Sequence, residues 1–222
     1  MSRFDLVIFD YDGVIADSEL LNNAAMAEVL TGIGLPTTTD EALALYLGRR
    51  WADCQPDIEA RLGRPCPETL LGDWTRLCHD RAASELRPVP GATQFMAGLS
   101  QARCVASSSP PNWIALGLQT LGIGPHQAGP VYSAAVHVTR GKPHPDLFLH
   151  AAQAMGAAPA RTLVIEDSLP GVQAGVAAGM TVVGLLAGGH VRDGHAERLS
   201  AAGAHHVLHD YASIEALMKT AQ

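Results

Sequence analysis

The chain has 222 residues, of which 47% are hydrophobic and 17% charged, and it carries a net charge of −7 at neutral pH. This length allows one well-buried core with a modest insertion. The acidic balance, without clustered Lys and Arg, argues against nucleic acid and anionic membrane surfaces as partners. No apolar stretch approaches the roughly 18 residues of a membrane helix, and no signal-peptide segment precedes the first strand, so we expect a cytoplasmic protein.

The first predicted element is a strand over residues 5–10, where an apolar run ends in Asp10. The apolar residues that follow recur at helical spacing. Stripes around Leu21 and Leu70 predict two longer helices. Two shorter helices are expected between them, because Gly and Pro residues separate the apolar groups. We therefore expect a four-helix insertion, a cap domain, over residues 17–86.

Beyond the linker at residues 87–91, helical and strand-like segments alternate. Strands are expected near residues 103–107, 130–133, 162–166, 181–186 and 206–208. Helices are expected near residues 92–99, 112–121, 145–156, 169–178 and 212–219. This alternation predicts an α/β fold, a doubly wound parallel sheet with right-handed crossovers and helices on both faces. The first strand must return to this sheet, so the core is divided between residues 1–16 and 87–222.

Polar groups suited to phosphoryl transfer follow three of the predicted strands and precede one helix. They are Asp10 and Asp12, Ser107 and Ser108, Lys142, and Glu166 and Asp167. In open α/β sheets, ligands bind just beyond the carboxyl ends of the strands. These acids, hydroxyls and the ammonium group can therefore converge on one crevice.

These residues and their spacing closely resemble the haloacid dehalogenase superfamily of aspartate-nucleophile phosphotransferases. Three segments look like the β-phosphoglucomutase-like phosphatases: FDYDGVIADSE from Phe9 to Glu19, KPHPD at Lys142, and EDSLPGVQAG from Glu166. The motifs span nearly the whole chain in the family's order. The resemblance implies a Rossmann-like core and an α-helical cap that folds over the active site.

The resemblance assigns Asp10 as the nucleophile, which would form an aspartyl-phosphate and divide one hard displacement into two easier ones. Asp12 would be the general acid for the leaving group and then the general base for water. Ser107, Ser108 and Lys142 would hold the transferring phosphoryl group through hydroxyl donors and a compact positive charge. Asp12 also argues for C–O–P chemistry, because haloacid dehalogenases and phosphonate-cleaving relatives lack an acid there.

The same resemblance implies Mg²⁺ as the cofactor. A phosphate dianion repels a carboxylate, and Mg²⁺, which prefers oxygen ligands, can neutralise that repulsion between one or two carboxylates and the substrate. The implied ligands are the Asp10 side chain, the Asp12 backbone carbonyl and the Asp167 side chain. Glu166 would be a direct ligand or would support the ion through water.

Substrate choice in such proteins lies in the cap. Arg49 and Arg50 stand in its middle and could bind a second anionic group, although an exposed, charged helix start explains them equally well. Asn22 lies where β-phosphoglucomutases typically carry a His, and the cap-loop Arg of those mutases is displaced here. Because Asn cannot titrate, we expect hydrolysis rather than isomerisation.

Three functions remain open at this stage. The first is a Mg²⁺-dependent phosphatase acting on small phosphorylated metabolites, with sugar phosphates expected. The second is a β-phosphoglucomutase-type phosphosugar mutase, and the third is a non-catalytic binding module on the same fold. The intact acids at Asp10, Asp12 and Asp167 argue against the third. We expect a monomer, because the cap already shields the site.

Overall fold

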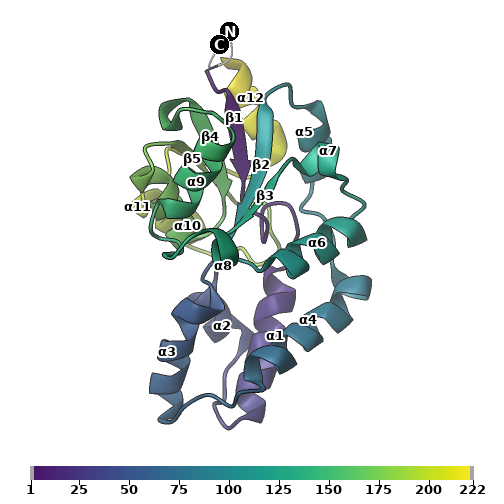
Figure 1. The fold of residues 1–222 in the computed structure, drawn as a ribbon, viewed down its shortest axis with the longest axis vertical. Coiled ribbons are helices and arrows are strands. Elements are labelled where there is room, and N and C mark those ends of the chain that lie inside the picture. Colours follow the sequence, from purple (N-terminus) through teal and green to yellow (C-terminus); the bar gives the residue numbers. More distant parts are fainter. Residues whose placement is uncertain (1–2, 221–222) are drawn as a thin grey trace.

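The computed structural model describes residues 3–220, which form an α/β lobe and a helical lobe (Figure 1). The sheet order is β3-β2-β1-β4-β5-β6, and every pair of neighbouring strands is parallel. Its strands are β1 (Leu6–Phe9), β2 (Ala102–Ser107), β3 (Val131–Ser133), β4 (Thr162–Glu166), β5 (Thr181–Leu185) and β6 (His206–Leu208). The predicted doubly wound parallel sheet is therefore confirmed.

Two apolar clusters, one on each face of the sheet, hold this lobe together. Val7 and Phe9 belong to one cluster and Leu6 and Ile8 to the other, because successive side chains of a strand point to opposite faces. All residues of β1, β4 and β5 are buried, as expected for strands covered on both sides.

Helices cover both faces of the sheet. The longer ones are α5 (Ala92–Gly98), α6 (Pro111–Thr120), α9 (Asp146–Ala154), α10 (Leu169–Ala177) and α12 (Tyr211–Thr220). Four short helical segments were not expected from the sequence: α7 (Pro125–Ala128), α8 (Ala134–His137), the 3-10 turn η1 (Pro159–Arg161) and α11 (His195–Ala201). Segments of three or four residues are too short to show a clear helical period, whereas α11, which is as long as α5, was not predicted.

The helical lobe contains α1 (Glu19–Gly32), α2 (Thr39–Tyr46), α3 (Trp51–Leu62) and α4 (Leu70–Glu85). A separate apolar cluster, which includes Leu30, Tyr46, Ile58 and Leu70, fills its interior. A capping box begins α2, where the Thr38 hydroxyl accepts from the Glu41 amide and the Glu41 carboxylate accepts from the Thr38 amide.

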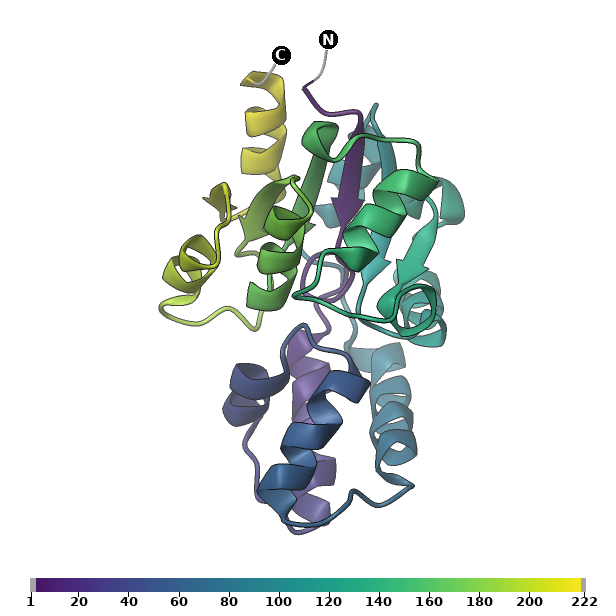
Figure 2. The same cartoon turned by 60° about the vertical axis from the view of Figure 1, so that its left-hand side comes forward.

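The helical lobe lies beyond the carboxyl ends of the strands, and the chain enters and leaves it through two adjacent connections (Figures 1 and 2). These connections are hydrogen-bonded to each other. The Asp17 amide donates to the Arg87 carbonyl at 2.9 Å, and the Val89 amide donates to the Ile15 carbonyl at 2.9 Å. The two covalent connections between the lobes are therefore paired with each other. Within residues 3–220, no helix is long and apolar enough to cross a bilayer.

Candidate active site

A buried lysine joins two acids at the carboxyl edge of the sheet. Asp10 follows β1, Glu166 ends β4, and Lys142 lies in the loop before α9. The Lys142 Nζ atom is 2.6 Å from Asp10 Oδ1 and 2.5 Å from Glu166 Oε1, and none of these side chains is more than 6% exposed. The sheet order places β1 and β4 side by side, which is why residues 156 positions apart in sequence meet here.

Burial and charge act in opposite directions on these groups. Burial raises the pKa of Asp10 well above its usual range, and the Lys142 ammonium opposes that effect. For Lys142, burial alone would lower the pKa, but the attraction of Asp10 and Glu166 outweighs it, so the pKa is raised. The lysine therefore stays charged and offsets part of the negative charge in the cluster.

The start of α10 fixes the Glu166 carboxylate. Its Oε2 atom accepts hydrogen bonds from the Asp167 and Ser168 amides, each at 3.0 Å, and from the Ser168 hydroxyl at 2.9 Å. Gly171 leaves the space that this carboxylate needs, because a Cβ atom there would lie 1.8 Å from Glu166 Oε1. The other carboxylate oxygen is thereby directed at Lys142.

Asp10, Glu166 and Asp167 form a group that could hold a metal ion. One ligand oxygen from each lies within 4.8 Å of the other two, and all three residues are buried. Within the described residues, neither Asp167 oxygen has a hydrogen-bond partner, although both are buried. Buried carboxylate oxygens without donors, beside only one compensating ammonium, fit a hard divalent cation such as Mg²⁺.

Two histidines from the segment after β5 also contact Asp167. The His195 Nε2 atom lies 2.7 Å from the Asp167 carbonyl oxygen and so must donate to it. The His190 Nε2 atom lies 3.0 Å from Asp167 Oδ2, at ion-pair distance but out of line for a hydrogen bond. On the other side, Gly13 has φ +74°, and a Cβ atom there would lie 1.7 Å from Asp167 Oδ2. Neither histidine stands in a spacing that would have suggested this site.

Four donors hold the Asp12 carboxylate. They are the Ser18 hydroxyl at 2.6 Å, the Asn22 amide at 3.2 Å, the Ser109 hydroxyl at 2.6 Å and the Trp113 indole N–H at 2.9 Å. They come from both lobes, since Asn22 lies on α1 and Trp113 on α6. Asp12 is thus oriented by residues as far as 101 positions away, of which only Asn22 was a sequence candidate.

The serines after β2 face the same space. Ser107 is buried, and its hydroxyl accepts from the Ser109 amide at 3.0 Å. The Ser108 hydroxyl instead donates to the Gly48 carbonyl of the helical lobe at 3.0 Å. A small cavity of about 60 Å³ has Asp10, Asp12 and all three serines in its wall.

The two arginines that the sequence singled out in the helical lobe, Arg49 and Arg50, are already engaged. Arg49 Nη2 lies 2.8 Å from the Asp57 carboxylate, and Arg49 Nη1 donates to the Leu45 carbonyl. Arg50 forms a bidentate pair with Asp53 at 2.7 and 2.9 Å. Arg50 also donates to the carbonyls of residues 134 and 139 in the α/β lobe, and so links the two lobes.

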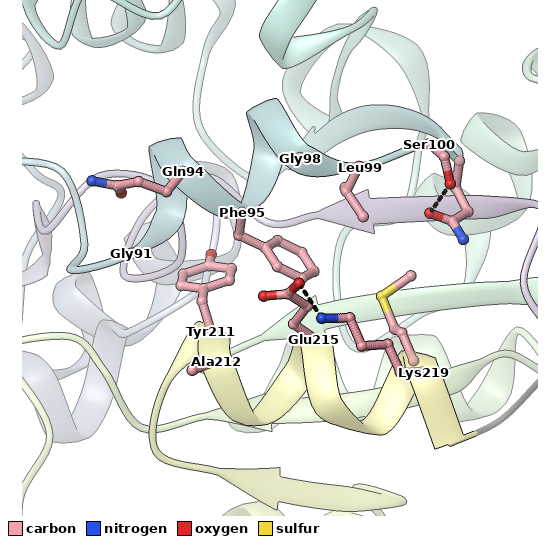
Figure 3. Close-up of a pocket in the computed structure, with 12 residues that line it drawn as sticks. Gly91, Gln94, Phe95, Gly98, Leu99, Ser100, Tyr211, Ala212, Glu215 and Lys219 are labelled. Atoms are coloured by element: carbon pink, nitrogen blue, oxygen red, sulfur yellow. Dashed lines mark hydrogen bonds and ion pairs between the residues drawn. The ribbon is translucent and has the colours of Figure 1, made fainter.

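Another cavity lies away from these acids. It has a volume of about 470 Å³ and is an open hollow between α5 and α12 (Figure 3). The charged residues at its wall, Glu215 and Lys219, pair with each other at 2.6 Å, and the Tyr211 hydroxyl donates to the Val14 carbonyl. None of the acids described above lines it, so we place the candidate active site between the lobes.

The sequence is similar to those of known proteins. The family model for haloacid dehalogenase-like hydrolases matches residues 4–179. Fructose-1-phosphate phosphatase of Escherichia coli K12 is 32% identical over 82% of this chain and 96% of its own length. The 6-phosphogluconate phosphatase of the same organism is 27% identical over 86% of each chain.

Solved structures give the same result. A haloacid dehalogenase-like protein from Agrobacterium tumefaciens superposes with a TM-score of 0.83 at 32% identity, over 98% of both chains. A haloacid dehalogenase family hydrolase from Deinococcus radiodurans, solved with bound phosphate and sodium, has a TM-score of 0.77 at 32% identity, over 100% of this chain and 97% of its own. The resemblance seen in the sequence is therefore confirmed, and the chain belongs to the haloacid dehalogenase-like hydrolases.

Proposed function

We propose that this protein is a Mg²⁺-dependent phosphatase that hydrolyses small phosphorylated metabolites, sugar phosphates in particular, through an aspartyl-phosphate on Asp10. The observation that carries the proposal is the buried cluster in which Lys142 contacts both Asp10 and Glu166, with Asp167 beside them. Relatives named as phosphatases of fructose 1-phosphate, 6-phosphogluconate and hexitol phosphates support the substrate class.

In this mechanism Asp10 attacks phosphorus and the ester oxygen leaves. Lys142 holds one carboxylate oxygen of Asp10, which orients the other, and its charge also attracts the phosphoryl group. Ser107 would donate its hydroxyl to a phosphoryl oxygen, and Ser108 would sit at the seam between the lobes. Because the transition state spreads charge over its equatorial oxygens, fixed donors of this kind supply much of the catalysis.

Asp12 would give its proton to the leaving alkoxide and later take one from the water that cleaves the aspartyl-phosphate. Its four donors fix the direction of the carboxylate during both steps. Since Asn22 and Trp74 bring α1 and α4 against this network, we propose that the helical lobe, residues 17–86, is a cap that completes the site.

Asp10, Asp167 and the Asp12 carbonyl would hold the Mg²⁺ ion, with Glu166 bound directly or through water. When bound, the ion would neutralise the repulsion between the phosphate dianion and the Asp10 carboxylate.

The decisive experiment measures inorganic phosphate released by the purified protein with Mg²⁺. The substrates are p-nitrophenyl phosphate and a panel of hexose, pentose and hexitol phosphates. We expect turnover of the aryl ester and faster turnover of at least one sugar phosphate. No release from any ester would reject the phosphatase and leave the non-catalytic binding module as the explanation.

Removal of the metal is expected to abolish activity. Excess chelator should stop phosphate release, and Mg²⁺ should restore it, whereas Ca²⁺ should substitute poorly because its looser coordination spoils the in-line geometry. A thermal unfolding series gives a second readout. Mg²⁺ should raise the melting temperature of the wild type by binding the native state, and should raise that of Asp167→Asn much less. Full activity in excess chelator would exclude the metal.

The mutase alternative makes a different product. With β-glucose 1-phosphate we expect slow release of inorganic phosphate and little or no glucose 6-phosphate. Asn22 donates to Asp12 but cannot exchange a proton with it, and the guanidinium groups of Arg49 and Arg50 are paired with Asp57 and Asp53. A coupled dehydrogenase assay measures glucose 6-phosphate. Efficient formation of this product would identify the protein as a mutase.

A further inference from the structure

The small cavity at Asp10 adjoins a second, larger one. The second cavity has a volume of about 320 Å³ and lies between the lobes. The two cavities share six residues of their walls, namely Asn22, Arg49, Trp51, Trp74, Ser108 and Ser109. A group attached to a phosphate at Asp10 would therefore extend from the first cavity, here called the inner chamber, into the second, the outer chamber.

The inner chamber is polar on its helical side. Glu19, Asn22 and Asn23 of α1 line it, opposite Asp10 and Asp12. Glu19 and Asn23 are both buried, and Asn23 Nδ2 donates to Glu19 Oε2 at 2.9 Å. Asn23 Nδ2 also donates to the Glu19 carbonyl at 2.9 Å, which uses both amide hydrogens, so the Asn23 oxygen, the Glu19 carboxyl group and the Asn22 amide remain to meet hydroxyl groups. The part of the substrate nearest the ester is thus expected to be a hydroxylated carbon chain or sugar.

The outer chamber is aromatic. All three tryptophans of the chain, Trp51, Trp74 and Trp113, line it, together with His79 and Leu71. The indole N–H groups of Trp74 and Trp113 are already used, because they donate to the Asn22 carbonyl at 3.0 Å and to Asp12 at 2.9 Å. Trp113 is buried and its ring stacks on His79, so the ring surface offered to a ligand comes from the half-buried Trp51 and Trp74, whose ring centroids lie 6.1 Å apart. Leu71 is 40% exposed, which leaves apolar surface uncovered at this wall.

Charge at the chamber wall does not favour a second anion. The only cationic side chains that line it, Arg49 and Arg50, each contact an aspartate of their own lobe, Asp57 and Asp53. Arg49 is further bound to the Leu45 carbonyl. The positive charge of both arginines is thus already balanced by these aspartates, which favours an uncharged group over a phosphate or carboxylate at the far end of the substrate.

We propose that the preferred substrate is a phosphomonoester whose leaving group has two parts, a hydroxylated segment next to the ester and a flat, uncharged heteroaromatic ring stacked on Trp51 and Trp74. Nucleoside 5′-monophosphates and flavin mononucleotide both have this chemistry. The proposal rests on the phosphatase function above and narrows its substrate class. Stacking on aromatic side chains supplies the binding energy for the ring, and the outer chamber has the size of a small-molecule site.

The first comparison in the test is between two esters that differ only in the ring. Ribose 5-phosphate and adenosine 5′-monophosphate share the same ester, and flavin mononucleotide tests a larger ring. Stacking of one base on aromatic side chains changes affinity by roughly 10-fold to 100-fold, so we expect kcat/KM for a ring-bearing ester to exceed that for ribose 5-phosphate by about this factor. Trehalose 6-phosphate is the control substrate, because its second ring is a sugar and is not flat.

Variants at the wall of the outer chamber test whether the preference for ring-bearing esters arises there. Trp51→Leu keeps apolar volume but removes the flat face, so the ratio of kcat/KM between ring-bearing and ring-free esters should fall towards one. Trp51→Phe should retain most of the ratio. Leu149→Ala, on the exposed side of α9 in the other lobe, serves as the matched control and should leave it unchanged.

A binding experiment keeps the proposal separate from the phosphatase assignment. In Asp10→Asn, calorimetric titration should give tighter binding of the two ring-bearing esters than of ribose 5-phosphate. Hydrolysis of p-nitrophenyl phosphate together with equal kcat/KM for ring-bearing and ring-free esters would overturn the ring proposal and leave the phosphatase intact. Preference for trehalose 6-phosphate, or an unchanged ratio in Trp51→Leu, would overturn it as well. If no ester is hydrolysed, the proposed phosphatase function is overturned. The calorimetric titration would then still test whether ring-bearing esters bind more tightly.

Discussion

Asp10→Asn is expected to abolish phosphate release while the fold survives. An amide is a poor nucleophile and a poorer ligand for Mg²⁺, so both proposed roles of the residue are lost together. Removal of a nucleophile from a comparable covalent mechanism costs on the order of 10⁶ in kcat, and we expect a loss of at least roughly 10⁴. The change is nearly isosteric, and it removes one of the buried negative charges around Lys142.

Three measurements check this result. Phosphate release is followed with p-nitrophenyl phosphate, circular dichroism reports the fold, and mass spectrometry of acid-quenched enzyme searches for a phosphoryl adduct, which the wild type should show and the variant should not. Asp146→Asn is the matched control, because Asp146 forms an exposed pair with Arg140 and does not line the inner chamber. Turnover near the wild-type rate in Asp10→Asn would remove this residue from the mechanism.

The strands of this fold could be predicted from the sequence because each is a short apolar run with clear limits. β1, β4 and β5 are buried along their whole length, so each contains a short hydrophobic run, and in β1 and β4 that run ends at an acid, Asp10 or Glu166. The helical lobe was equally visible, since its apolar cluster repeats at helical spacing. By contrast, α7 and α8 have four residues each, which is barely one turn and leaves no period to detect.

In the candidate site, too, some residues could be predicted from the sequence and others could not. Asp10 and Glu166 stand directly at the carboxyl ends of β1 and β4, where the rule for parallel sheets indicates that they meet, and Lys142 lies in a loop at the same edge. The positions of Ser109 and Trp113 against Asp12 depend on how the segment after β2 and the start of α6 pack against the segment after β1, and the position of His190 against Asp167 depends on the path of a loop. No local pattern records such long-range contacts, so the sequence could not supply them.

Lys142→Met is expected to be the second most damaging change, because it affects stability and turnover by separate routes. The ammonium is the compensating charge between Asp10 and Glu166, and the methionine side chain fills its space without replacing that charge. Breaking a buried ion pair from one side typically costs about 3–5 kcal/mol of unfolding free energy. Turnover should fall by roughly 10²-fold to 10³-fold, since a preorganised positive charge at the phosphoryl group is lost.

The stability defect should depend on pH in a defined direction. The Lys142 charge opposes the burial that raises the pKa of Asp10, so its removal raises that pKa further. A carboxyl group with a raised pKa in the folded state favours folding while it is protonated, and this stability is lost as pH rises from its ordinary pKa of 3.8 through the folded value. In metal-free protein, the deficit of Lys142→Met relative to the wild type should therefore be smaller at about pH 5 than at about pH 8.

A double variant separates the two effects of the lysine. In Lys142→Met with Glu166→Gln, one unpaired buried charge is removed, while the amide oxygen can still accept from the Asp167 and Ser168 amides. Denaturant unfolding should show that the double variant recovers a large part of the lost stability. Phosphate release should stay low, because neither substitution restores a positive charge beside Asp10. Recovery of activity along with stability would mean that Lys142 only compensates buried charge, and near-normal turnover in the single variant would exclude it from phosphoryl transfer.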